Sequence, residues 1–328
     1  MEVAVKTAKN LVRVALLLLC ASAIAFTLVS ISPLDPLQTN IGQAALGSLS
    51  AEQTAQLESY WGVGEPPIQR YLSWLGDFVR GDMGISLLYR QSVATVIAEK
   101  LANSLLLLAF AWVISGVLGF TLGIIAGAYQ GRAIDRAIQS YSLIIASTPL
   151  FWIGIMLLLI FAVWLQIAPI GLSVPIGMEA ADVTLIDRLR HAILPALALS
   201  ITGIANITLH TREKMIAVMG SDYVLFARAR GESTRRIVTR HGVRNVILPA
   251  MTLQFALINE ILAGTILVEQ VFSYPGLGQA VVTAGLGGDM PLLLAITVIS
   301  TALVFGGNFI ANTLYGVVDP RIRKGVSK

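Results

Sequence analysis

Six long apolar runs determine what this chain can fold into. Each is close to the roughly 20 residues that a helix needs to cross a bilayer. Charged residues make up 13% of the sequence, whereas about 25% is usual for a soluble domain. We therefore predict an all-α integral membrane protein with six transmembrane helices. The expected spans are Val14–Ile31, Ser104–Tyr129, Ile138–Leu165, Ile193–His210, Val246–Val268 and Leu292–Val318.

The first apolar run has two interpretations. Lys6, Lys9 and Arg13 precede it, and a cleaved signal peptide has the same basic and apolar order. Because further spans follow, we interpret the run as a retained first transmembrane helix. The single cysteine, Cys20, excludes an internal disulfide and any CxxC metal or redox pair.

The region between the first two spans differs in composition. It is rich in proline and scattered charge, and we predict an extracytoplasmic lobe of short helices. Ser50–Tyr60 can begin a helix, with Ser50 as its cap and Gln53 at the third position. Gln69–Val79 carries an apolar stripe typical of an interfacial helix. The expected divisions are residues 1–31 (tail and first span), 32–103 (lobe) and 104–328 (a five-helix core).

The distribution of Lys and Arg sets the orientation. Basic residues cluster before the first span, in the short loop at Gln130–Arg136, between the fourth and fifth spans, and after the last span, while Glu269–Pro291 has none. Short loops rich in Lys and Arg stay on the cytoplasmic side. We therefore predict that both termini are cytoplasmic.

The longest of these basic loops, residues 212–245, is called the basic segment. From Arg212 to Arg244 it holds eight Lys or Arg residues against three acids. Ser221 or Asp222 can cap a first helix, Gly231 permits a tight turn, and Ser233 can cap a second helix. A loop that merely obeys the positive-inside rule and touches lipid head groups is the alternative, but such a loop needs no paired caps around a glycine.

The basic segment resembles the cytoplasmic coupling region of ABC-importer permeases of the dipeptide, oligopeptide and nickel family. The pattern D-Y-V-x-x-A-R-A-[KR]-G, a basic helix and R-H-x-x-R-N-x-x-x-P is present, with Leu225 at the position where many other ABC importers carry Glu. The matching residues are Asp222, Tyr223, Val224, Ala227, Arg228, Ala229, Arg230, Gly231, Arg240, His241, Arg244, Asn245 and Pro249. Similar pieces lie at Arg80–Gly84, Thr148–Trp152, His191–Pro195, Phe272–Gly278 and Asp319–Arg323.

The resemblance implies a type I ABC importer permease fold and a set of partners. The chain would pair with a second permease subunit in a bacterial inner membrane and contact membrane lipid. Two ATPase subunits would hold ATP and Mg, and an extracytoplasmic binding protein would deliver peptides, nickel or a metal chelate. The residues expected to couple to the ATPase are Asp222, Tyr223, Ala227, Arg228, Ala229, Gly231, Arg240, His241 and Arg244.

The sequence carries no catalytic motif. It lacks a GxxxxGK[ST] phosphate loop, so ATP must be bound by a partner. It also lacks HExxH, and its three histidines are far apart. We predict a non-catalytic pore subunit with no catalytic residues, no metal site and no cofactor of its own. A nucleic-acid binder is excluded because such a protein would not surround its basic face with apolar runs.

Polar residues inside the spans are the candidates for contact with cargo. Glu260, beside Asn259, lies in the fifth span, where a carboxylate costs about 2.5–3.5 kcal/mol on insertion scales and faces a cavity or a partner. It is predicted either to line the pore and meet a cation or peptide amine, or to hydrogen-bond a neighbouring helix. A Glu here resembles some nickel-transporting members. Asn206 is a further candidate, although Asn206, Thr208 and His210 do not share one helical face.

Two further features are structural expectations. Glycines at 116, 119, 123 and 127 recur at three- or four-residue spacing and predict a close-packed face. Glu269 is expected at the outer surface as an anchor or gate element. An ATP-independent secondary transporter or channel remains the alternative function, although the charged residues in several spans and the inverted repeat that favour it are absent. A membrane scaffold would not need the helix–glycine–helix unit.

Overall fold

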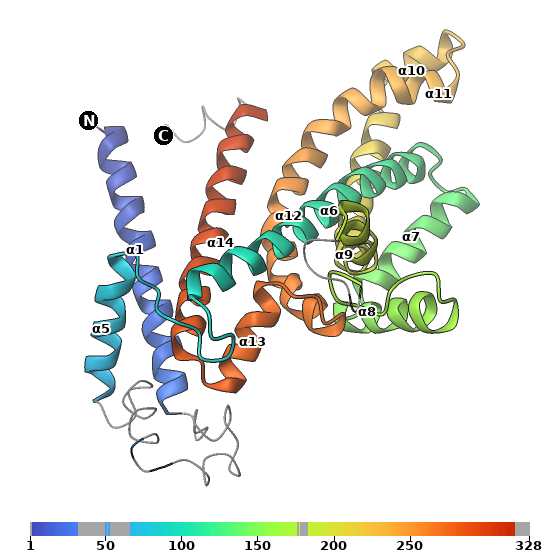
Figure 1. Cartoon of the computed structure of the whole chain (residues 1–328). Coiled ribbons are helices and arrows are strands. Elements are labelled where there is room, and N and C mark those ends of the chain that lie inside the picture. The colour runs from blue at the N-terminus through green and yellow to red at the C-terminus, as the bar shows by residue number, and fades with distance from the viewer. Residues whose placement is uncertain are drawn as a thin grey trace. The chain divides into compact units, whose positions relative to one another are not determined.

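The computed structural model describes residues 2–31, 50, 52, 66–175, 177 and 183–318, and nearly all of them are helical (Figure 1). Within these residues, five helices are long and apolar enough to cross a membrane, or six if one bent pair counts as a single span. This agrees with the predicted helical class. The five are Val12–Ser30, Val93–Ala128, Leu185–Met219, Thr234–Val271 and Met290–Phe309.

The stretch expected to be the third span is not one helix. Helix α7 (Ala133–Ala146) ends before Pro149, and α8 (Leu150–Leu157) with the π-helix η1 (Leu158–Trp164) leaves at an angle of 109° (Figure 1). Pro149 lacks an N–H group and disfavours helical geometry at the residue before it. The hydroxyls of Ser147 and Thr148 donate to carbonyls at the end of α7. The prediction missed this break because composition alone remains apolar through it.

The structure forms two compact units, and each is described by itself. The first comprises residues 1–103 and 276–306, and the second comprises residues 104–275 and 307–328. Residues 276–306 thus group with the N-terminal part, whereas the sequence-based division assigned them to the core. The Asp319–Arg323 motif and nearly all of the expected Ser50–Tyr60 helix lie outside the described residues.

In the first unit, α1 (Glu2–Ser30) packs against α5 (Pro67–Val79) (Figure 1). Ser22 Oγ lies 2.8 Å from Tyr71 Oη, and the Tyr71 ring lies 5.3 Å from the Phe26 ring. Helix α5 coincides with the apolar stripe that predicted a helix over Gln69–Val79. The stripe therefore packs partly against the first span.

The core of the first unit joins the start of α6 (Val93–Ala128) to α13 (Leu277–Gly287) and α14 (Met290–Val318). Asp289 is fully buried between these elements. Its Oδ2 accepts from Ser86 Oγ at 2.6 Å and from the backbone N–H of Leu88 at 3.1 Å, and its Oδ1 accepts from the N–H of Leu292. Asp289 is therefore a structural acceptor that holds the 84–92 loop.

In the second unit, the α6 glycines at 119, 123 and 127 form the predicted close-packed face against α9 (Leu185–Met219), whereas Gly116 lies against Gln254. A Cβ atom at Gly123 would lie 2.5 Å from Thr211 Cβ, and one at Gly127 would lie 2.5 Å from Met215 Cβ. Contacts this short leave no room for any side chain. The two backbones approach closely because α6 carries glycine at these positions.

A buried ion pair fixes the start of α7 to α9. Asp135 Oδ1 lies 2.5 Å from Arg212 Nε, Asp135 Oδ2 lies 2.9 Å from Arg212 Nη2, and the N–H of Gly131 donates to Oδ2 at 2.8 Å. The Asp135 side chain is 2% exposed and that of Arg212 is 17% exposed. Arg212, counted in the basic segment, is thus engaged inside the fold.

Glu269, near the end of α12 (Val243–Val271), is fully buried within the protein. Ser104 Oγ donates to Glu269 Oε1 at 2.6 Å, and the N–H of Tyr274 donates to the Glu269 carbonyl. Burial, and secondarily the Glu269 carboxylate, raises the pKa of Tyr274 to about 12. Glu269 is therefore an internal anchor between α12 and α6.

Candidate functional sites

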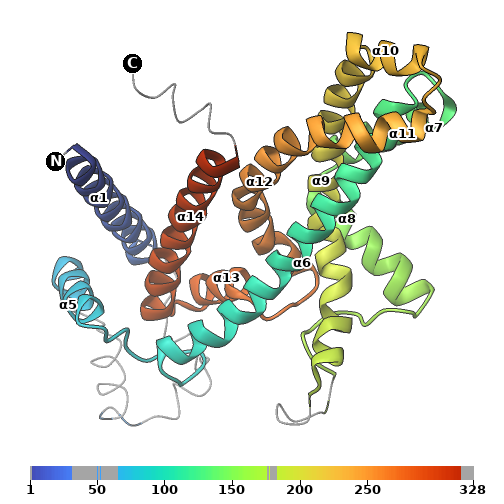
Figure 2. The ribbon, with the colours of Figure 1, turned by 90° about the horizontal axis from the view of Figure 1, so that it is seen from above.

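The basic segment folds as two helices around a left-handed glycine. Helix α10 (Asp222–Ala229) is followed by a turn at Gly231, whose φ is +79°. Helix α11 (Thr234–Ile237) then leads into the π-helix η2 (Val238–Gly242). The N–H of Gly231 donates to the Arg228 carbonyl, and the N–H of Glu232 donates to the Ala227 carbonyl. Figure 2 shows α10 and α11 beyond the ends of α9 and α12. The structure thus forms the expected helix–glycine–helix unit.

The expected side-chain caps do not form. Ser221 and Ser233 stand at the N-cap positions of α10 and α11, but neither side chain accepts a hydrogen bond from its helix. The Ser221 hydroxyl instead donates to the Val218 carbonyl at the end of α9. Ser221 is therefore engaged with the preceding helix.

Helix α10 buries one side and exposes the other. Val224 and Ala227, three positions apart, are buried with Met215, Met219, Ile237 and Val246. The Phe226 side chain is 74% exposed, and Leu225 and Tyr223 are also exposed. An exposed apolar ridge on a basic surface is a feature of protein interfaces.

A pocket of about 400 Å³ lies beside this ridge. Glu232 Oε2 lies 3.8 Å from His241 Nε2 across the pocket wall. Asn245 Nδ2 donates to Tyr223 Oη at 3.3 Å and to the His241 carbonyl at 2.7 Å. Asp222, Tyr223, Ala227 and His241 from the predicted set line the pocket, with Phe226, Arg230 and Glu232. The other predicted residues do not line it but are exposed: Arg228, Ala229, Gly231, Arg240 and Arg244.

The predicted pore residues separate into two groups. Asn206 Nδ2 of α9 lies 3.4 Å from Glu260 Oε1 of α12, and Glu260 is exposed. Asn259 instead donates to Asn308 Oδ1 of α14. Glu260 thus hydrogen-bonds a neighbouring helix while its carboxylate remains open on one side. Thr208 is buried and donates to the Gly119 carbonyl, and His210 is exposed.

Glu260 borders a pocket of about 140 Å³ at the break between α7 and α8, called the Glu260 pocket. Thr148 and Leu150 come from the break, and the remaining lining comes from α9 and α12. These remaining residues are Leu199, Thr202, Gly203, Leu257 and Ile261. The spacing 257, 260 and 261 places three lining positions of α12 on one helical face.

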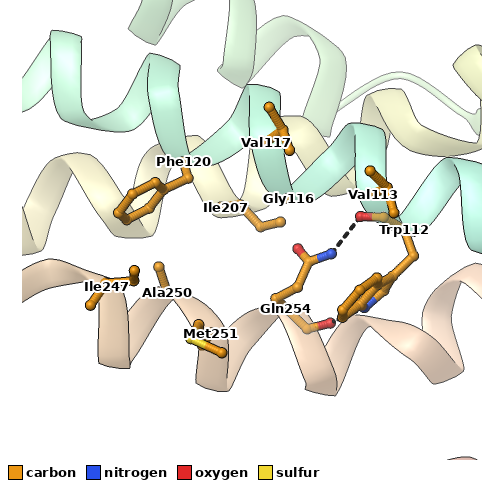
Figure 3. A pocket seen from close by; sticks show the side chains of 10 residues that line it. All are labelled: Trp112, Val113, Gly116, Val117, Phe120, Ile207, Ile247, Ala250, Met251 and Gln254. Carbon is orange, nitrogen blue, oxygen red and sulfur yellow. Dashed lines mark hydrogen bonds between the residues drawn. The ribbon is translucent and has the colours of Figure 1, made fainter. Parts of the chain in front are cut away.

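A further pocket, of about 290 Å³, contains none of the predicted residues (Figure 3). It lies between α6 and α12 and is almost entirely apolar. Trp112 Nε1 donates to the Gln254 carbonyl at 2.9 Å, and Gln254 Nε2 donates to the Trp112 carbonyl. A glutamine inside an apolar run was the available sequence signal. The two side chains clamp α6 to α12.

Among the described residues, no group of three or more His, Cys, Asp or Glu side chains is placed to hold a metal ion. His191 Nδ1 lies 2.8 Å from the Gly171 carbonyl, and His241 faces Glu232. These two histidines therefore have protein partners.

The comparisons with known proteins identify the family. The pattern of the family described as "Binding-protein-dependent transport system inner membrane component" matches residues 119–324. The chain belongs to this family. The oligopeptide transport system permease protein AppB of Bacillus subtilis (strain 168) is 33% identical over 93% of this chain and 95% of that protein. The dipeptide transport system permease protein DppB of Escherichia coli (strain K12) is 30% identical over 91% and 92%.

This family membership makes the chain an ABC-importer permease of the peptide family and a multi-pass inner-membrane protein. The fold agrees with that of the inward-facing MetNI methionine ABC transporter. The TM-score is 0.55 at 13% identity, over 69% of this chain and 97% of that chain. Residues 119–324, which match the family pattern, contain the basic segment and the Glu260 pocket. The predicted type I importer permease fold is confirmed.

Proposed function

We propose that this permease passes small peptides from an extracytoplasmic binding protein into the cytoplasm, driven by ATP hydrolysis on partner subunits. The observation that carries the proposal is the alignment, over more than nine tenths of the chain, with proteins named for oligopeptide and dipeptide transport. An exposed carboxylate on an apolar spanning helix supports it. Such a group must face water, cargo or a protein partner rather than lipid.

The proposed assembly has a second permease subunit, two ATPase subunits that bind ATP and Mg, and a binding protein. The surface of α10 around Phe226, with its adjacent pocket, is named the proposed coupling surface. An exposed aromatic side chain beside a pocket is the type of feature that anchors a protein interface. Both termini and this surface are placed in the cytoplasm, since the Lys- and Arg-rich short loops favour that side.

Coupling would work through differential contacts. The closed ATPase pair would bind the proposed coupling surface more tightly in one position than in another. The pore would change conformation with that surface, because the same helices form part of both. Helix α9 runs directly into α10, and α12 begins at the end of η2. A displacement of α10 is thereby passed to the two helices that line the Glu260 pocket.

Nickel or a metal chelate is a second candidate cargo. The observation in its favour is the exposed carboxylate of Glu260, because carboxylate oxygen is one of the ligands that divalent cations take. A single carboxylate is a weak metal site, and peptide remains the proposed cargo.

The test is purification of the complex from its native membrane, followed by uptake and ATPase assays in proteoliposomes. Dipeptides, longer peptides and nickel with and without a chelator are compared, each with and without the binding protein. Stimulation of ATPase activity by peptides, dependent on the binding protein, is expected. Stimulation by nickel alone would reassign the cargo. Transport by the chain without any ATPase would overturn the importer and favour a secondary transporter or channel.

A further inference from the structure

The apolar pocket between α6 and α12 is open on the surface of two spanning helices (Figure 3). It is called the α6–α12 pocket. Its back wall is closed, because Ile207, Ala250 and Gln254 are buried, whereas Val113 and Val117 at its rim are exposed. An open apolar surface of this kind binds either membrane lipid or another protein.

The α6–α12 pocket and Glu260 lie on different sides of α12. Met251, which lines the pocket, and Glu260 are both exposed and are nine residues apart. Nine residues make about two and a half helical turns, so the two side chains leave α12 in opposite directions. A carboxylate on a spanning helix must face water, cargo or a protein partner. The side of α12 that carries Met251 is therefore the side available to lipid.

A positive charge lies at one end of the α6–α12 pocket. Arg244 precedes Ile247, a lining residue, by three positions, which makes the two side chains neighbours on α12. Arg244 is exposed and forms no ion pair with any described residue. The family pattern places Arg244 among the coupling residues, yet it does not line the pocket beside Phe226. Arg244 therefore offers its guanidinium to a group at the mouth of the apolar groove.

The length of the groove matches one leaflet of a bilayer. Arg244 and Gln254 are ten residues apart, which is about 15 Å along a helix, and the hydrocarbon core of one leaflet is half of about 30 Å. With the proposed cytoplasmic position of the basic segment, Arg244 lies at the inner head groups and the Trp112–Gln254 clamp closes the deep end. The volume of about 290 Å³ is that of roughly ten water molecules. It therefore holds a segment of an acyl chain and not a whole lipid.

We propose that the α6–α12 pocket binds an acyl chain of an anionic phospholipid from the cytoplasmic leaflet, with the lipid phosphate at Arg244. A guanidinium forms paired, charge-assisted hydrogen bonds with a phosphate, and the groove holds the chain by van der Waals contact. A zwitterionic lipid carries the same phosphate but adds a positive group, which Arg244 and the exposed Arg240 repel. The inference uses the proposed orientation and does not depend on the cargo.

The first test identifies the occupant by photolabelling. The full complex is placed in nanodiscs that contain phosphatidylglycerol or phosphatidylcholine with a diazirine on one acyl chain, and mass spectrometry locates the adducts. Phosphatidylglycerol should label Met251 and Val117 about fivefold more than phosphatidylcholine does, which is the preference that one Arg near a membrane surface gives. Leu118 is exposed on α6 but does not line the pocket, so the two lipids should label it equally.

Arg244→Gln should remove the preference for phosphatidylglycerol at Met251. Arg236→Gln is the matched control, because Arg236 is an exposed arginine of α11 that lies outside α12, and it should retain the preference. Equal labelling of Met251 by the two lipids in the parent, or a preference that survives Arg244→Gln, would overturn the anionic-lipid site. Absence of any adduct at Met251 and Val117 would also overturn it and would show that a protein partner covers the groove.

The second test fills the groove. Val117→Trp should lower the labelling of Met251 by phosphatidylglycerol about fivefold or more, because the indole ring takes the volume that the acyl chain needs. Leu118→Trp adds the same ring outside the pocket and should leave that labelling unchanged. Undiminished labelling in Val117→Trp would show that the chain does not enter between α6 and α12. Neither test uses cargo or ATP, so a parent complex that imports no peptide would refute the proposed function and leave the lipid site to be decided by the labelling.

Discussion

The proposed coupling surface and the Glu260 pocket expose opposite kinds of side chain. At the coupling surface the exposed side chain is apolar: the Phe226 ring is 74% exposed, while the Glu232 carboxylate is half-buried, with its Oε2 atom 3.8 Å from His241 Nε2. In the Glu260 pocket the apolar lining is at least partly buried, while the Glu260 carboxylate is exposed.

This difference indicates different occupants. An exposed apolar ring gains most from a protein surface that removes it from water, whereas an exposed carboxylate on a spanning helix needs water, cargo or a protein partner. Helix α9 connects the two regions, because it carries Thr202 and ends at Met219, just before α10. The variants below separate the two regions or break their connection.

The largest effect is expected from Gly231→Pro, which should abolish peptide uptake. Proline requires φ near −65° and has no N–H, whereas Gly231 has φ of +79° and donates to the Arg228 carbonyl. The turn between α10 and α11 therefore cannot form. Uptake and ATPase co-purification are measured in the same membranes.

Gly231→Asn is the matched control, since asparagine tolerates left-handed geometry, and it should retain most of the uptake. Persistent uptake in the proline variant would show that the turn is not the coupling element.

The next largest effect is expected from Asp135→Leu, which leaves the Arg212 guanidinium buried without its carboxylate. Breaking a buried ion pair from one side costs about 3–5 kcal/mol. We expect a lower yield of folded complex, a lower melting temperature in detergent and a proportionate loss of uptake, because α7 is no longer fixed to α9.

The double variant Asp135→Leu with Arg212→Met should recover most of the melting temperature, since it removes both charges. A single variant as stable as the parent would show that the pair contributes nothing to the connection. A double variant no better than the single one would place the defect in packing.

The sequence pattern predicted features that depend on neighbouring residues along the chain. The glycine spacing of α6 identified the close-packed face, and the D-Y-V…G pattern located the turn at Gly231. The ion pair of Asp135 with Arg212 spans 77 positions and the Ser104–Glu269 bond spans 165, so no local period reveals them.

An intermediate effect is expected from Phe226→Ala on the coupling surface. Burying a Phe side chain at an interface contributes about 1.5–3 kcal/mol, so the Kd for the ATPase subunit should rise about tenfold or more. Titration of purified ATPase onto the permease pair in lipid nanodiscs measures it. Leu225→Ala is the matched control, because Leu225 is exposed on the same helix but does not line the pocket. A larger effect at Leu225 would move the contact to the other side of α10.

The smallest effect is expected from Glu260→Gln, which should lower uptake of dialanine about fivefold while ATPase assembly stays intact. Glutamine keeps an oxygen that accepts hydrogen bonds, so only the charge is lost. Because Glu260 is exposed, water screens that charge, and about 1 kcal/mol is the appropriate scale. The loss should be smaller at high ionic strength. Uptake equal to the parent at every salt concentration would show that Glu260 is only a structural partner of Asn206. Loss of ATPase assembly would show that a change in the Glu260 pocket also affects the coupling surface.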